Sequence, residues 1–331
     1  MKALITHIQQ LGIPGGQISF VKPDGYTVDC AFGWGGSGGV LSTVSEQNIF
    51  RYASLAKILT SITAIKLAQQ HTIALNWHLL PSLGLKTQPS DARITDITLS
   101  QLLRHRAGFD RSISGDPMLK DQPWCPAHLT TLSLLKLDFT PEEKYSYSNL
   151  GYCLLGQALV QTTGKPLTKL ITDTLDLSQY SSIQPIVSSA GLTDEVSYFF
   201  DSPDTEQQQL RFNYPAMLAS GGWAGTAAEL SKLMQQQLSA ENSTELLLDA
   251  GIYSECDLTV WRNCHGMVFY KYQQPQQHVM YWRDGSLPGL SAFVAATKQA
   301  DTVVLLLNYR KYQWLKFNDA IGMQIYRYLN N

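Results

Sequence analysis

The sequence predicts an α/β protein of the α+β kind: an antiparallel sheet built from both chain ends and flanked by helices, with an inserted, mainly helical lobe. Two β-rich runs in residues 17–33 lie on either side of Pro23-Asp24-Gly25, a turn typical of hairpins. After residue 266, four more β-branched and aromatic runs follow, and a helical pattern covers residues 315–329. Because strands occupy both ends and helical patterns lie between them, we expect one sheet assembled from both termini.

Helical signals dominate the middle of the chain. Apolar residues recur every three or four positions after Ser54, which predicts a helix with one buried stripe; they are Leu55, Ile58, Leu59, Ile62 and Ile65. Capping-box patterns at Thr98 and Thr226 open two further helices. Asn149 is expected to cap another helix, which ends at Gly164.

The composition indicates a soluble, enzyme-sized protein. The chain has 25 Lys and Arg against 27 Asp and Glu, spread without basic blocks, so nucleic acid is not an expected partner. No apolar run approaches the roughly 20 residues of a transmembrane segment. The N-terminus also lacks the apolar stretch of about 7 or more residues that a signal peptide needs. We expect a cytoplasmic protein if the chain is complete, and a periplasmic or secreted one if a leader has been removed.

The cysteines and histidines predict no metal site. Five cysteines are an odd number for a disulfide framework, and their spacing is too irregular for thiolate ligands; they are Cys30, Cys125, Cys153, Cys256 and Cys264. We interpret most of them as small buried hydrophobic residues. The seven histidines show no ligand spacing, so we predict neither metal nor cofactor.

The pattern Ser-x-x-Lys, which can pair a nucleophile with its base, occurs at Ser19, Ser54 and Ser133. Ser19 lies in a strand run, where residues three apart point to opposite faces. Ser133 lies in a short segment without helical continuation. Ser54 alone begins a long helix, on which Lys57 faces the same way and backbone N–H groups stabilise negative charge. From spacing alone, an exposed serine cap beside a solvated lysine remains an alternative.

A second candidate site is Tyr147-Ser148-Asn149, directly before a helical pattern. The tyrosine is suited to relay a proton to a leaving group, and the asparagine offers a donor and an acceptor to an amide substrate. The alternative is that Tyr147 packs and Asn149 caps the helix.

The third candidate site lies between two strand runs and contains Arg283, Gly285 and Ser286. The glycine would let a substrate lie close to a strand edge, and the N–H of Ser286 would supply an oxyanion donor. The alternative is a hairpin loop in which Arg283 and Asp284 are solvated.

The run from Gly33 to Gly39 fits both G-x-G-x-x-G and G-x-S-x-G, with Ser37 at the serine position. Either motif must open a helix, whereas the chain continues with the β-branched and serine-rich residues 40–45. We interpret the run as a flexible loop. An esterase that uses Ser37 is the competing hypothesis.

Taken in chain order, the three candidate sites resemble the S-x-x-K, Y-x-N and K/H-x-G elements of class C β-lactamases, serine DD-peptidases and related esterases. Residues 50–57, 102–109, 147–152 and 221–227 are also similar to stretches of this family. The resemblance implies one β-lactamase/transpeptidase-like catalytic domain over residues 1–331. Its lobes would be residues 1–60 plus 215–331, with the sheet, and residues 61–214, mainly helical.

The resemblance also implies roles for individual residues. Ser54 would be the acylated nucleophile and Lys57 its base. Tyr147 would protonate the leaving atom and help to activate the deacylating water. Asn149 would orient the substrate amide, and the N–H groups of Ser54 and Ser286 would form the oxyanion hole.

Arg283 departs from the family pattern, which has Lys or His at this position. Arginine keeps the positive charge but does not exchange a proton near neutral pH, so a carboxylate-binding role is what we expect of it. The leading hypothesis is a cofactor-free serine hydrolase that acts on an amide, ester or β-lactam of a small-molecule or peptide-like acyl donor. The alternative is a penicillin-binding-like sensor or scaffold with weak catalysis.

Overall fold

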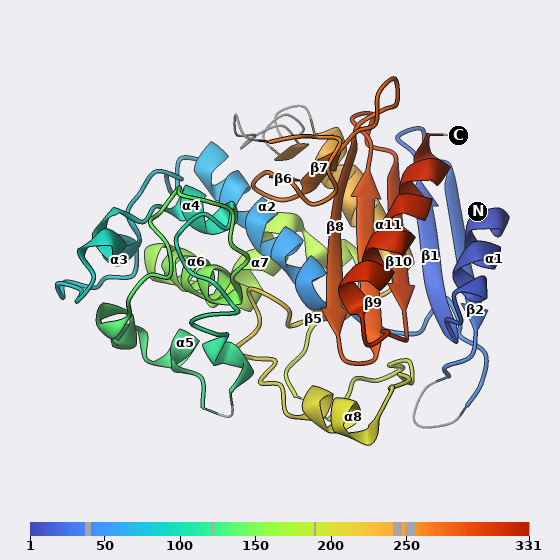
Figure 1. Cartoon of the computed structure of the whole chain (residues 1–331), viewed down its shortest axis with the longest axis horizontal. Helices are drawn as coiled ribbons and strands as arrows, with labels where there is room; N and C mark the ends of the chain where they lie inside the picture. Colours follow the sequence, from blue (N-terminus) through green and yellow to red (C-terminus); the bar gives the residue numbers. More distant parts are fainter. Residues whose placement is uncertain (37–40, 121, 189, 241–246, 249–255, 331) are drawn as a thin grey trace.

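The computed structural model describes residues 1–36, 41–120, 122–188, 190–240, 247–248 and 256–330. Its described residues include a seven-stranded antiparallel sheet with strand order β2-β1-β10-β9-β8-β7-β6 (Figure 1). The strands are β1 (Gly15–Val21), β2 (Thr27–Gly33), β6 (Cys264–His265), β7 (Tyr270–Tyr272), β8 (Met280–Leu287), β9 (Leu290–Ala296) and β10 (Thr302–Leu307). Because β1 pairs with β10, the sheet joins both chain ends, which confirms the predicted fold class.

Two hairpins set the register of the sheet. The first joins β1 to β2 around Pro23-Asp24-Gly25, as predicted. The second joins β8 to β9 through Pro288-Gly289, with Leu287 opposite Leu290. Residues 283–286 therefore lie inside β8, and the expected alternative of a solvated hairpin loop at these residues is wrong.

Helices cover both faces of the sheet. Helices α1 (Lys2–Gln10) and α11 (Trp314–Leu329) pack on one face and share a core with alternate residues of the strands (Figure 1). Helix α9 (Ala227–Ser239) contacts β1 and β10 on the opposite face, which joins the larger core. The alternation of strand side chains thus buries the sheet on both sides.

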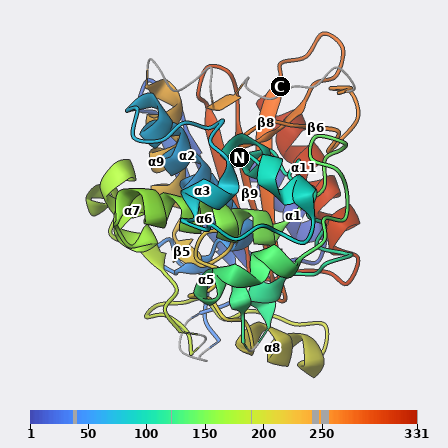
Figure 2. The same ribbon diagram turned by 90° about the vertical axis from the view of Figure 1, so that its left-hand side faces the viewer.

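A mainly helical region, placed between the sheet strands in sequence, lies beside the sheet in Figure 1 and in front of it in Figure 2. Its helices are α3 (Leu79–Ser82), α4 (Leu99–Leu103), α5 (Trp124–Ala127), α6 (Asn149–Thr163), α7 (Leu167–Leu175) and α8 (Pro203–Leu210). Short 3-10 helices are η1 (Ala53–Leu55), η2 (Ala92–Asp96), η3 (Pro117–Leu119), η4 (Leu129–Leu134) and η5 (Leu177–Gln179). The division into lobes at residues 60 and 215 stays a prediction.

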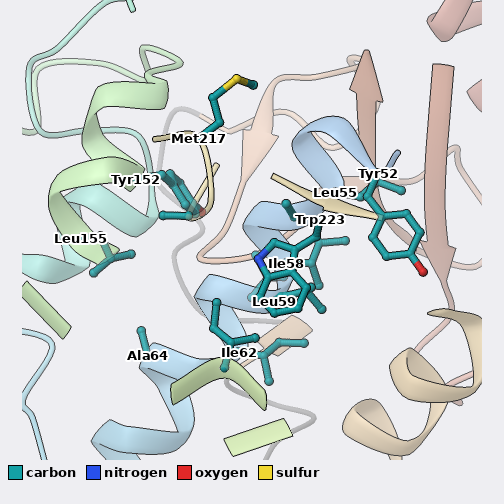
Figure 3. Close-up of a cluster of buried hydrophobic side chains, with 14 of the residues drawn as sticks. Tyr52, Leu55, Ile58, Leu59, Ile62, Ala64, Tyr152, Leu155, Met217 and Trp223 are labelled. Carbon is teal, nitrogen blue, oxygen red and sulfur yellow. The ribbon is translucent and has the colours of Figure 1, made fainter. Parts of the chain in front are cut away.

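Helix α2 (Ala56–Gln69) lies between the sheet and the helical region and is buried on nearly all sides. Its residues belong to one buried cluster with Tyr152 and Leu155 of α6 and with Trp223 (Figure 3). The prediction of a single buried stripe was wrong, because Thr60, which a stripe would leave exposed, is also buried. Polar residues on a helix buried all round need hydrogen-bond partners, and the hydroxyl of Thr60 donates to the carbonyl of Ala219 at 2.9 Å.

The helix caps agree in part with the sequence patterns. Thr98 forms the predicted capping box at α4, and Thr226 accepts a hydrogen bond from the N–H of Glu229 at α9. The cap of α6 is Ser148 instead of Asn149, which is the first helical residue. The side chain of Asn149 is therefore available for other contacts.

The interpretation of the cysteines was wrong, because four of them form two disulfides. Cys125 pairs with Cys153, and Cys256 pairs with Cys264. Cys30 is a partly buried free thiol. The first pair joins α5 to α6 across 28 residues, a proximity that sequence spacing does not reveal.

No helix of the described residues is long and apolar enough to cross a membrane.

Candidate active site

Ser54 lies in the 3-10 turn η1, which connects strand β3 (Phe50–Arg51) to helix α2. The preceding residue, Ala53, has a φ of 47°, in the left-handed region that is costly for a residue other than glycine. A small second sheet holds this turn in place: β3 pairs with β5 (Trp223–Gly225), which pairs with β4 (Gln184–Pro185). The backbone N–H of Tyr52 also donates to the carbonyl of Trp223 at 2.8 Å.

Arg51 anchors the strand before Ser54. Its guanidinium forms an ion pair with Glu195 at 2.5 Å and donates to the hydroxyl of Tyr214 at 2.5 Å. Both charged side chains are less than a tenth exposed. Breaking such a buried pair by removing one partner costs about 3–5 kcal/mol, so this contact strongly favours the observed position of the turn.

Lys57 lies in the first turn of α2, three residues after Ser54, and is completely buried. Its Nζ donates to the side-chain oxygen of Asn149 at 2.6 Å and to the carbonyl of Ser220 at 2.7 Å, and lies 3.2 Å from Oγ of Ser54. Burial, together with the nearby positive charge of Arg283, lowers the pKa of Lys57 well below its ordinary value. The alternative of a solvated lysine is therefore wrong.

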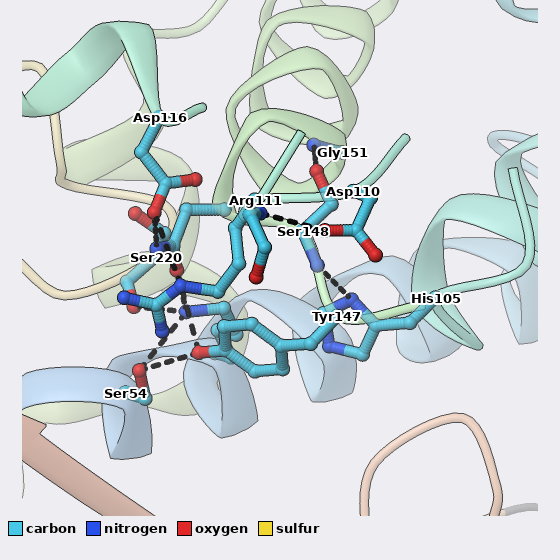
Figure 4. A network of polar contacts seen from close by, with 12 residues as sticks. Ser54, His105, Asp110, Arg111, Asp116, Tyr147, Ser148, Gly151 and Ser220 are labelled. Atoms are coloured by element: carbon cyan, nitrogen blue, oxygen red, sulfur yellow. Dashed lines mark hydrogen bonds and ion pairs between the residues drawn. The ribbon is translucent and has the colours of Figure 1, made fainter. Parts of the chain in front are cut away.

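Tyr147 approaches Ser54 from the helical region. The Tyr147 hydroxyl lies 2.6 Å from Oγ of Ser54 and donates to Oδ1 of Asn149 at 3.3 Å (Figure 4). Burial raises the pKa of Tyr147 to about 12, although the charges of Arg283 and Arg111 oppose that shift. The phenol is consequently protonated at neutral pH. The structure thus brings Lys57 and Tyr147 within hydrogen-bonding distance of the hydroxyl of Ser54.

Two residues that the sequence analysis missed support Asn149. The amide Nδ2 of Asn149 donates to a carboxylate oxygen of Asp116 at 2.6 Å, and Nε of Arg111 lies 3.6 Å from the same oxygen. The Arg111 guanidinium also lies over the ring of Tyr147, 5.5 Å from its centroid. Asp116 and Arg111 lie in an irregular segment after α4 with no motif of its own, so the sequence contains no signal for them.

Strand β8 lies directly against the turn that carries Ser54. A Cβ atom at Gly285 would lie 2.6 Å from the carbonyl oxygen of Tyr52 and 3.0 Å from the backbone nitrogen of Ser54. A glycine is therefore required here by close approach of two backbone segments. Ser286, the next residue, lines the same cavity as Ser54, and the role of its N–H as an oxyanion donor stays a prediction.

Arg283 is buried behind the site, with 2% of its surface exposed. The guanidinium donates to the carbonyl of Val268 at 2.7 Å and lies 3.2 Å from Nε2 of both His265 and His105. Asp284, on the other face of β8, pairs with Arg262 instead. The expected alternative, in which Arg283 and Asp284 are solvated, is wrong. The carboxylate-binding role expected of Arg283 stays a prediction.

Two cavities meet at Ser54. One has a volume of about 380 Å³ and includes Tyr147 and Arg283 in its lining. The other has a volume of about 170 Å³ and includes Asn149. Because Ser54 and Ser286 line both cavities, a carbonyl group at their junction would have space on each side. Ser37, the serine of the competing esterase hypothesis, lies outside the described residues.

The chain belongs to the beta-lactamase family, whose model matches residues 1–319. It is 30% identical over 331 residues to a probable fimbrial assembly protein FimD of Dichelobacter nodosus, a match that covers 98% of this chain and 82% of the relative. It is also 30% identical over 216 residues to the D-alanyl-D-alanine-carboxypeptidase/endopeptidase AmpH of Escherichia coli, covering 59% of this chain and 50% of that protein.

A comparison with solved structures finds the same kind of fold. The D-amino acid amidase from Ochrobactrum anthropi superposes with a TM-score of 0.77 at 16% identity, covering 99% of this chain and 98% of the amidase. At this identity the likeness concerns the fold. The family and the fold together place the chain in the penicillin-binding-like superfamily, as the sequence motifs predicted.

Proposed function

We propose that this chain is a serine hydrolase that forms an acyl-enzyme on Ser54 with amide, ester or β-lactam substrates. The observation that carries the proposal is the position of the Ser54 hydroxyl, 2.6 Å from the Tyr147 hydroxyl and 3.2 Å from Nζ of Lys57. A serine needs such a neighbouring base to attack a carbonyl.

The contacts of Lys57 support its role as the base. A neutral amine has two N–H groups and one lone pair, and two oxygen acceptors, on Asn149 and Ser220, occupy two directions around Nζ. The lone pair is then left for the hydroxyl proton of Ser54. Burial favours this neutral form because it lowers the pKa of Lys57.

In the acylation step, Oγ of Ser54 forms a bond to the substrate carbonyl carbon and passes its proton to Lys57. The backbone N–H groups of Ser54 and Ser286 would stabilise the oxyanion. When the bond to the leaving group breaks, Tyr147 gives its proton to the leaving atom, and the extra proton on Lys57 restores the phenol. The net transfer is one proton from Ser54 to the leaving group. Water then releases the acyl group and returns a proton to Ser54.

Intact-mass measurement after incubation with a penicillin, and separately with an activated ester, tests the proposal. We expect a covalent adduct that peptide mapping assigns to Ser54 and that is absent in Ser54→Ala. Undiminished labelling of Ser54→Ala would contradict the proposal, and an adduct on Ser37 would favour the competing esterase site.

A second candidate function is a sensor or scaffold with weak catalysis. It is favoured by the relatives named for fimbrial assembly, since they match this chain over nearly its whole length. The same labelling experiment separates the two functions. An enzyme releases the acyl group and turns over many substrate molecules, whereas a sensor retains a stable adduct on Ser54 without turnover.

We also propose that the chain works in an oxidising compartment such as the periplasm. The support is the pair of disulfides, Cys125–Cys153 and Cys256–Cys264, because such bonds persist where thiols are not kept reduced. Thiol titration of protein isolated from its host under denaturing, non-reducing conditions should find Cys30 as the one reactive thiol. Five reactive thiols would contradict the proposal.

A further inference from the structure

The two cavities that meet at Ser54 differ in size, charge and apolar lining. If Tyr147 protonates the leaving atom, the cavity that it lines holds the leaving group, and the cavity lined by Asn149 holds the acyl group. The leaving-group cavity has about twice the volume, 380 Å³ against 170 Å³. The larger space therefore lies on the leaving-group side.

We infer that this chain selects leaving groups that carry both a carboxylate and an apolar side group larger than a methyl. Arg310 would bind the carboxylate, and Trp314 and Leu315 would contact the apolar group. The inference rests on the proposed function, because the role of Tyr147 decides which cavity is assigned to the leaving group.

Of the four arginines that line the leaving-group cavity, two have their partners within the protein. Arg262 makes two hydrogen bonds to Asp284, at 3.0 and 2.7 Å, and an ion pair with Asp319 at 2.7 Å. Arg283 is held by a backbone carbonyl and two histidines. Neither guanidinium is free to turn toward a substrate without losing buried contacts, which is costly.

The other two arginines, Arg111 and Arg310, line both cavities. Arg111 has Asp116 at 3.6 Å, a distance at which the ion pair is weak, and its side chain is 42% exposed. Arg310 forms no hydrogen bond or ion pair with any residue in the described part of the chain. The N–H groups of the Arg310 guanidinium thus remain available to a ligand in the cavity.

The surroundings of Arg310 favour binding of an anion. Partial burial is the largest influence on its pKa and lowers it, and the positive charge of Arg111 acts in the same direction. Asp201 offsets these effects in part, but its carboxylate accepts a hydrogen bond from Tyr309 at 2.6 Å. A substrate carboxylate would relieve the repulsion between the two arginines and could accept two parallel hydrogen bonds from one guanidinium.

The apolar part of the cavity comes from the start of α11, four residues after Arg310. Trp314 is partly exposed and Leu315 is 45% exposed, although both are large and hydrophobic. Exposed apolar side chains that line a concave site are typical of ligand contacts. Since Arg310 lies in the connection before α11, Trp314 is the first residue of that helix, and both line one cavity, a single leaving group would reach both.

Four esters with the same N-acetylglycyl acyl group test the inference. Two have lactate or 3-phenyllactate as the leaving group, with the carboxylate free, and two have the methylamides of these acids. We expect the highest kcat/KM for the phenyllactate ester with a free carboxylate. Arg310→Gln should lower kcat/KM for both carboxylate esters by roughly 10- to 150-fold, as for loss of charge-assisted hydrogen bonds, and leave the methylamides nearly unchanged. Trp314→Ala should reduce the preference for phenyllactate over lactate by roughly tenfold.

Arg327→Gln is the matched control, because it makes the same change of charge at an exposed position near the end of α11. It should alter all four rates alike and by less than about a factor of two, as expected of a screened surface charge. Arg310→Lys, which keeps the charge without the two parallel donors, should fall between wild type and Arg310→Gln. Thermal melting of each variant shows whether it is folded.

Several outcomes would overturn the inference. One is wild-type hydrolysis of the methylamides as fast as of the carboxylates, and another is an equal loss for all four esters in folded Arg310→Gln. Loss of the carboxylate preference in Arg111→Gln but not in Arg310→Gln would place the anion on Arg111 instead. If no ester is hydrolysed and Ser54 forms no adduct with the penicillin or the activated ester, the proposed function fails, and this inference with it.

Discussion

Replacement of Gly285 by alanine should damage catalysis more than stability. The added Cβ would lie 2.6 Å from the carbonyl oxygen of Tyr52 and 3.0 Å from the backbone nitrogen of Ser54. Both are backbone atoms, so the clash is relieved only if β8 and the turn move apart. Such a shift of roughly 0.5 to 1 Å at the reacting atoms is expected to lower kcat by up to about 100-fold. Overpacking of this kind costs about 1–3 kcal/mol of stability.

The assay is kcat/KM for an activated ester together with the melting temperature. Gly151→Ala is the matched control, since its Cβ would lie 3.6 Å from Leu102, an ordinary contact, inside helix α6. There alanine should stabilise the helix by about 0.5–1 kcal/mol and leave activity intact. Wild-type kcat/KM in Gly285→Ala, or equal losses in both variants, would refute the reasoning that the close approach of β8 positions the oxyanion donors.

Three further predictions follow from the contacts described above. Lys57→Ala and Tyr147→Phe should each slow acylation by roughly 100-fold or more, measured by stopped-flow with an activated ester; wild-type rates would contradict their roles. Arg283→Gln should move the acid limb of the pH profile of kcat/KM to higher pH, because loss of that cation raises the pKa of Lys57, which must be neutral to act as the base; an unmoved limb would contradict this. Replacing Cys125 and Cys153 by serine should lower the free energy of unfolding by about 3–4 kcal/mol in urea titrations, since the bond closes a loop of 28 residues, and an unchanged midpoint would refute it.

The sequence was sufficient for features in which local pattern and tertiary environment agree. The strands after residue 266 and the hairpin at Pro23-Asp24-Gly25 alternate or turn in ways that the sheet requires. The distinction of Ser54 from Ser19 also followed from local structure, because Ser19 does lie in strand β1. In these cases the residues adjacent in sequence determine which secondary structure the segment forms.

Features that depend on contacts distant in sequence escaped the sequence analysis. Cys125 and Cys153 meet because α5 packs on α6, and no spacing rule encodes that packing. Asp116 became part of the site only because its loop folds back over Asn149. The burial of α2 on all sides likewise reflects the helical region that covers it, since its apolar residues at three- and four-residue spacing also fit a surface helix.

Arg283 illustrates how such distant contacts decide what a charged residue can do. Its guanidinium has three neutral hydrogen-bond partners, and two of them are the imidazoles of His105 and His265. His105 also stacks on Tyr147, with ring centroids 4.6 Å apart, and its Nδ1 accepts from the N–H of Ser148 at 3.2 Å. Burial and the neighbouring positive charges lower the pKa of His105 well below its usual value, so its ring is neutral.

A neutral imidazole has one acceptor nitrogen, so His105 cannot accept from both Ser148 and Arg283 at full strength. The cation is therefore incompletely paired beside Tyr147. An unneutralised positive charge at this place lowers the pKa of Lys57 and opposes the rise in the pKa of Tyr147. A lysine at position 283 would lose its proton more readily when buried, whereas arginine keeps its charge in every protonation state of its neighbours. The departure from the family pattern thus gives the site a fixed cation, which explains how Arg283 can favour a neutral Lys57 from its buried position.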